Sequence, residues 1–203
     1  MIISHQKGRG KKIHLLLDET YQITTDVDFW AKHYIKDGTE IDEEEWQALV
    51  HAINYRKAVN KCFDLLSRRD HSVKELKTKL LRSVDPESAD AAIDRMLELG
   101  YLDDEKYAKA LLHHLTENKN MSAAFIRQEM FRRGVPGEIV TALLSETEID
   151  NVAAIEELIV KKYRTKLLAE NGREKVIAAL MRKGFSYSDI REAFRNLEEE
   201  YEL

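Results

Sequence analysis

The sequence has little of the material from which disulfides, turns and membrane spans are made. Its 203 residues include one cysteine, two prolines and eight glycines. The single cysteine, Cys62, excludes an internal disulfide framework, and no apolar run approaches the roughly 18 residues of a membrane span. The N-terminus lacks the apolar stretch of a signal peptide. We therefore expect a cytoplasmic protein in which Cys62 is a small buried hydrophobic residue.

The residues that are abundant favour helices. Leu, Ala, Glu, Lys and Arg dominate, and this composition predicts an all-helical protein. Charged residues make up 34% of the chain, which suits an elongated molecule with much surface. The net charge of -5 argues against a protein that coats nucleic acid by bulk charge.

A period of 50 residues runs through the sequence. Three apolar registers obey it, and we assign them to the core: Leu76, Ile126 and Val176; Leu80, Met130 and Leu180; Leu81, Phe131 and Met181. The same offset relates Pro86 to Pro136 and Gly134 to Gly184. Such a period is typical of an array of small supersecondary units, and arrays usually present a long surface to a partner.

Helix start and stop signals divide each period into three helices. Ser72 with Glu75 is a capping box, Asp85 before Pro86 begins a third helix, and Gly100 ends it. We predict an all-α fold, an elongated and curved tandem array of three three-helix repeats. The expected parts are an N-terminal region at 1–41, then repeats at 42–104, 105–149 and 150–203. The N-terminal region is expected to hold a flexible arm (5–12), a hairpin (13–17 with 21–25) and a helix reaching residue 35.

Converging catalytic groups are absent from the pattern. The seven histidines are scattered, and His113 with Glu117 has metal-ligand spacing but no third candidate nearby. No nucleotide-binding glycine loop, nucleophile elbow or Cys-His pair occurs. We therefore expect no enzyme activity, no cofactor and no metal.

Basic residues recur with the repeat and form the candidate partner-binding set. Residues 57–84 hold eight Lys or Arg against three acids, and residues 161–183 hold eight against two. Cations in a last helical turn are stabilising in themselves, by roughly 0.3–1 kcal/mol, so solvated helix faces are an alternative explanation. The candidates are Arg68, Arg69, Lys74, Lys77, Lys79, Arg82, Arg127, Arg132, Arg133, Lys161, Lys162, Arg182 and Lys183.

Three segments resemble the RecX family of regulatory proteins. Arg69–Leu80 is similar to the signature R-x-x-S-x-x-E-L-x-x-K-L, and Leu99–Ala108 resembles G-Y-L-D-D-x-x-[FY]-A. Ile126–Val135 is similar to R-x-E-L-x-x-[KR]-G-[IV], with Met130 in place of leucine. The resemblance runs from about residue 58 to the C-terminus. It departs most in the third repeat, where Asn171-Gly172 replaces a serine cap.

The resemblance implies a negative regulator of the RecA recombinase. Such proteins bind the RecA filament on single-stranded DNA and inhibit its ATPase and recombinase activities, with a role in DNA recombination, repair and the SOS response. For this chain we expect a monomer with at most weak direct DNA contact and no membrane contact. Two alternatives stay open: a stand-alone helix-turn-helix DNA-binding regulator, and a generic helical scaffold for another protein.

Overall fold

The structure is a computed structural model that describes residues 1–201, without the side chains of residues 118, 200 and 201. The described chain forms two compact units. One comprises Met1–Arg69 with Leu76–Tyr101, and the other comprises Asp70–Glu75 with the chain from Leu102 onward. None of the described helices combines the length and the hydropathy that crossing a bilayer requires.

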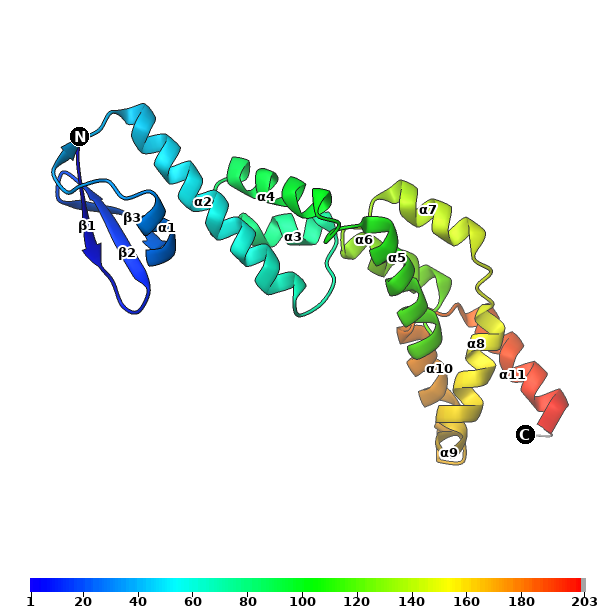
Figure 1. Cartoon of the computed structure of the whole chain (residues 1–203). Coiled ribbons are helices and arrows are strands. Elements are labelled where there is room, and N and C mark those ends of the chain that lie inside the picture. Colours follow the sequence, from blue (N-terminus) through cyan, green and yellow to red (C-terminus); the bar gives the residue numbers. More distant parts are fainter. Residues whose placement is uncertain (202–203) are drawn as a thin grey trace. The chain divides into compact units, whose positions relative to one another are not determined.

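A four-stranded antiparallel sheet occupies the N-terminal region (Figure 1). Its strands are β1 (Ile2–Lys7), β2 (Lys12–Leu17), β3 (Thr20–Asp26) and β4 (Thr39–Glu40), in the order β3-β2-β1-β4. The expected hairpin is confirmed, because β2 pairs with β3. The expected flexible arm is wrong over residues 5–7, which belong to β1, and at Lys12, which begins β2. Strand β1 pairs with β2 and buries Ile3 almost completely.

Two helices follow the sheet. The short helix α1 (Val27–Lys32) begins where Asp26 accepts a 2.8 Å hydrogen bond from the Phe29 N–H, and it ends before the residue 35 that we expected. The long helix α2 (Glu43–Leu66) begins with a reciprocal capping box between Asp42 and Glu45. Arg56 of α2 binds the Asp26 carboxylate at 2.7 and 3.0 Å, which lowers the pKa of Asp26 and fastens α1 to α2.

The tandem three-helix architecture is confirmed. The first repeat is formed by the end of α2, α3 (Val73–Leu80) and α4 (Pro86–Glu98). The second contains α5 (Asp104–His113) with the π-helix η1 (His114–Asn118), then α6 (Ala123–Arg132) and α7 (Gly137–Glu146). The third contains α8 (Asn151–Leu158), η2 (Ile159–Tyr163), α9 (Arg164–Leu167), α10 (Gly172–Arg182) and α11 (Tyr187–Tyr201).

Two of the three repeated apolar registers form the cores of the repeats. Every member of these two registers is fully buried, on the second helix of its repeat: Leu76, Ile126, Val176, Leu80, Met130 and Leu180. Cys62 is also fully buried, and burial raises the pKa of its thiol to about 11. The third register is not part of the core.

Buried serines join consecutive repeats. The Ser72 hydroxyl accepts a 3.1 Å hydrogen bond from the Glu75 N–H, as the predicted cap requires, and also donates to the Arg133 carbonyl at the end of α6. At the next junction, the Ser122 hydroxyl caps α6 and the Ser122 N–H donates to the Lys183 carbonyl at the end of α10. Each bond satisfies a carbonyl that a helix end leaves without an intrahelical partner.

The start of the next repeat's first helix completes each junction. The Val73 N–H donates to the Asp104 carboxylate at 2.9 Å, and the Ala123 N–H donates to the Asn151 side-chain oxygen at 3.1 Å. At both junctions, the N-terminus of the second helix of one repeat is therefore held by two elements of the following repeat. Because free N–H groups at a helix start need acceptors, this arrangement satisfies them within the protein.

We predict that a glycine-to-alanine substitution at a junction lowers the free energy of unfolding by more than backbone strain alone would. Gly134 and Gly184 have φ of +80° and +85°, and a Cβ there would lie 2.7 Å from the Lys74 Cβ and 2.6 Å from the Ser122 Oγ. Gly100 is the matched control, because its φ is +71° but nothing lies within 4 Å of its added Cβ.

The Gly100→Ala variant should lose about 1–2 kcal/mol of unfolding free energy from left-handed strain. The Gly134→Ala and Gly184→Ala variants should each lose a further 1 kcal/mol or more, about the cost of forcing extra volume into packed structure. Urea unfolding of the three variants measures the difference. Equal losses would show that the junctions tolerate the methyl group.

Candidate functional site

The third repeated register lies on the surface. Leu81, Phe131 and Met181 are 45%, 48% and 53% exposed, so their assignment to the core is wrong. A single exposed hydrophobic residue is ordinary on a protein surface. Here the same position of all three repeats carries a large apolar side chain that the fold itself does not bury.

Helix geometry explains why this register leaves the core. At about 100° per residue, a position four residues after Leu76 lies about 40° round the helix, but a position five residues after it lies about 140° round. Leu80 therefore shares the buried face of Leu76, and Leu81 does not. The C-terminal end of each second helix turns this side chain to solvent.

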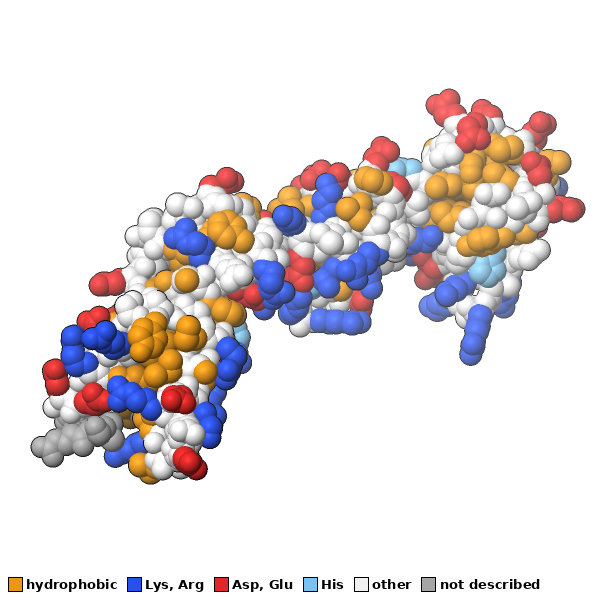
Figure 2. Space-filling view, turned by 180° about the vertical axis from the view of Figure 1, so that it is seen from behind, with side chains coloured by type: hydrophobic (Ala, Val, Ile, Leu, Met, Phe, Trp, Pro, Cys, Tyr) orange, Lys and Arg blue, Asp and Glu red, His pale blue; other side chains and the backbone are white. Residues whose placement is uncertain are grey.

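An exposed arginine follows each of these side chains. We call the three combinations the apolar–arginine pairs: Leu81 with Arg82, Phe131 with Arg132, and Met181 with Arg182. On the face shown in Figure 2, exposed hydrophobic side chains of the C-terminal unit lie among Lys and Arg side chains. Arg82 and Arg182 form no ion pair with any residue whose side chain the structure describes. Two of the three arginines are thus available to a partner.

Arg132 and Arg133 share one carboxylate. Glu129 is only 9% exposed, and it accepts two 2.6 Å hydrogen bonds from Arg132 and one of 2.7 Å from Arg133. The Arg132 hydrogen bonds, with those of Arg133, lower the pKa of Glu129 to about 2. Arg132 remains exposed, whereas Arg133 is half-buried and also donates to the Tyr107 hydroxyl. Arg133 is therefore largely occupied within the protein.

A lysine cluster lies at the junction of the second and third repeats. The Lys183 ammonium donates to the carbonyl of Lys119, a residue that was not among the sequence candidates. Burial lowers the pKa of Lys183, and the positive charges of Lys162 and Lys119 lower it further. Spacing along the chain could not reveal this group, because Lys119 precedes Lys183 by 64 residues.

The remaining candidates do not converge on one site. Arg68, Lys77 and Lys161 pair with Asp64, Asp90 and Glu157, and Arg127 is exposed on α6 without an ion pair among the described side chains. Arg69, Lys74 and Lys79 each interact with other groups of the chain. Among the sequence candidates, the apolar–arginine pairs and the lysine cluster are therefore the groups that we carry forward as a hypothesis.

Among the described residues, one group of three side chains has the donor atoms for a metal ion. It consists of His51, Asp85 and Glu87, and it does not include His113 or Glu117. Sequence reasoning missed this group, because His51 lies 34 residues before Asp85 on a different helix.

We predict that Glu129→Gln removes acid-sensitive stability. Because the native pKa of about 2 lies below the ordinary value of 4.5, the carboxylate stabilises the fold fully above about pH 4.5. Its contribution is lost as the pH falls towards 2. The variant should lose about 1–2 kcal/mol at pH 7, less than the whole pKa shift implies, because Arg132 is solvent-exposed.

Urea unfolding at pH 7 and at pH 3 measures this effect. The difference between wild type and variant should be smaller at pH 3. Glu98→Gln is a suitable control, since Glu98 forms an exposed ion pair with Arg95, and such pairs contribute little. An equal loss at both pH values would contradict the assigned role of Glu129.

The geometry defines a helical-repeat protein with a surface feature that recurs on each repeat. Three family models match it in order. The model for the first three-helix domain of RecX matches residues 58–96, that for the second matches 103–144, and that for the third matches 148–194. The chain belongs to the RecX family of regulatory proteins.

Individual relatives agree with this assignment. Regulatory protein RecX of Bacillus licheniformis is 30% identical over 207 residues, which cover 98% of this chain and 77% of the relative. A crystal structure of regulatory protein RecX has a TM-score of 0.59 and 21% identity, covering 94% of this chain and 97% of that chain. The structure of RecX from Lactobacillus salivarius has a TM-score of 0.58 and 22% identity, covering 72% and 98%. The two structures support the fold.

Proposed function

We propose that this protein is a negative regulator of RecA that binds the RecA filament on single-stranded DNA and inhibits its ATPase and recombinase activities. Membership of the RecX family supports a regulatory role. The observation that carries the proposal further is the recurrence of the apolar–arginine pairs on all three repeats.

A filament repeats its surface from one protomer to the next, and a protein that binds several protomers needs a contact that also repeats. Each apolar–arginine pair combines a side chain that gains from burial with a cation that can bind a carboxylate or a phosphate. Apolar anchors and arginines contribute most of the affinity at many interfaces. Peripheral charges act mainly on encounter rate and register.

We propose that the protein acts as a cytoplasmic monomer and works by occupying the filament rather than by catalysis. The lysine cluster of Lys119, Lys162 and Lys183 is a suitable place for weak contact with the phosphates of the DNA in the filament.

We predict that truncating the apolar members weakens inhibition of RecA. Replacing Phe131 and Met181 together by serine removes two contacts at modest cost to the fold, because about half of each residue is already exposed. The double variant should require at least about tenfold more protein for half-inhibition of RecA ATP hydrolysis on single-stranded DNA, equivalent to the loss of about 1.4 kcal/mol of binding free energy. The wild type should inhibit at well below one molecule per RecA.

Leu168→Ser is the matched control. Leu168 is 83% exposed in the third repeat but lies outside the repeated position, so this variant should inhibit like the wild type. Circular dichroism and urea unfolding establish that all variants remain folded. Unchanged inhibition by the double variant would refute the role of the pairs, and no inhibition by the wild type, even in excess, would refute the proposed function. Tight binding to one duplex sequence, with no effect on RecA, would instead support the helix-turn-helix alternative.

A further inference from the structure

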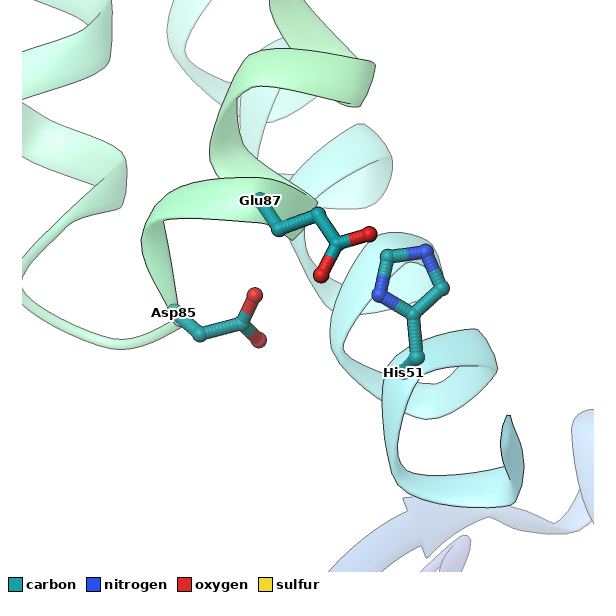
Figure 3. A group of neighbouring side chains, drawn as sticks. All are labelled: His51, Asp85 and Glu87. Atoms are coloured by element: carbon teal, nitrogen blue, oxygen red, sulfur yellow. The ribbon is translucent and has the colours of Figure 1, made fainter. Parts of the chain in front are cut away.

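Three side chains from two helices converge in the first unit. His51 lies on α2, Asp85 is the residue that caps α4, and Glu87 belongs to the first turn of α4. Their potential ligand atoms all lie within 4.8 Å of one another. Figure 3 shows the two carboxyl groups and one imidazole nitrogen directed toward a common space.

One member of the cluster is held in position. Asp85 accepts a 2.8 Å hydrogen bond from the Ser88 N–H and one of 2.9 Å from the Asn54 amide of α2. Hydrogen bonds from outer groups orient metal ligands and reduce the cost of assembling them. The His51 Nδ1 atom lies 3.5 Å from the Ser88 hydroxyl, a weak contact that an ion bound at this nitrogen would replace. His51 and Asp85 are both half-buried, so an ion can reach them.

The third member of the cluster, Glu87, can adjust its position. Glu87 is exposed, and its side chain can rotate to bring an oxygen closer to the other two ligands. Ligands of a bound zinc ion lie about 2.0–2.2 Å from it, so the cluster must contract slightly on binding. A long, unburied side chain allows this contraction without disturbing the packing of α2 on α4.

The donor set selects the kind of ion. One imidazole nitrogen with two carboxylate oxygens suits Zn²⁺ and similar first-row transition metals, whereas Mg²⁺ and Ca²⁺ prefer oxygen ligands throughout. Three protein ligands leave a fourth position for water. Two carboxylates with a neutral imidazole carry a charge of -2, which balances a divalent cation.

We propose that His51, Asp85 and Glu87 form a Zn²⁺-binding site that links α2 to α4. The N-terminal half of α2 packs on the sheet through Trp46, Leu49 and Ile53, and α4 belongs to the first repeat. A bound ion would therefore fasten the N-terminal sheet region to the first repeat. This role is separate from RecA binding, so the site and the proposed function can be tested independently.

The test is a Zn²⁺ titration of the full chain, without a histidine tag, against a chromophoric chelator at pH 7.5. The wild type should bind one equivalent of Zn²⁺ that His51→Gln and Glu87→Gln each weaken at least about tenfold, a factor comparable with the loss of an outer-shell partner at known sites. His113→Gln is the control, because His113 is an exposed histidine outside the cluster. Excess Mg²⁺ should not displace the ion.

Thermal unfolding provides a second readout. Zn²⁺ should raise the unfolding temperature of the wild type and of His113→Gln, since a ligand that binds only the native state stabilises it, and chelation should reverse the shift. The shift should be lost in the two cluster variants. If the wild type binds Zn²⁺ no more tightly than His51→Gln, or if all four proteins respond alike, the proposed site is wrong. The proposed inhibition of RecA does not depend on either result, so the two proposals can fail separately.

Discussion

A buried serine hydroxyl with two hydrogen bonds holds the start of α3 against the end of α6. Ser72 caps its own helix by accepting from the Glu75 N–H, and it also donates to the Arg133 carbonyl 61 residues later. Removing it would leave the Glu75 N–H and the Arg133 carbonyl without this partner next to a fully buried position, which is more costly than the loss of an exposed hydrogen bond. Ser122 occupies the equivalent place and its N–H reaches Lys183, again 61 residues later. Both contacts lie within the second compact unit, and each joins a helix start to a helix end through polar groups with defined geometry.

This junction determines where the candidate binding surface lies. The last turn of α6 contacts the preceding repeat on one side, where Gly134 lies against Lys74. On its other side, the same turn presents Phe131 and Arg132 to solvent. Because both sides belong to one turn, the contact with Lys74 also fixes the orientation of Phe131 and Arg132. The exposed pair of this repeat therefore needs no separate loop or insertion.

Much of this architecture could be predicted from the sequence, because the signals involved are local. The 50-residue period and the helix caps predict the helices and two fully buried registers. The third register was misassigned because its period matches that of the core, although Leu81 lies about 100° from Leu80 around the helix. Strand β1 was missed because Gly8 and Gly10 suggest a flexible arm, and only pairing with β2 explains the burial of Ile3. Long-range contacts such as those of Ser72 leave no additional trace in residue spacing.

The third repeat differs from the other two at the start of its second helix. Its second helix, α10, begins at Asn171 in a left-handed conformation, with no hydrogen bond from the capping side chain. Ser72 and Ser122, in contrast, cap helix starts that also form hydrogen bonds with the following repeat. The start of α10 lies against α9, where a Cβ added at Gly172 would lie 2.2 Å from the Lys166 carbonyl oxygen. Position 172 therefore requires glycine, and α10 retains the apolar–arginine pair and the buried core while its cap differs.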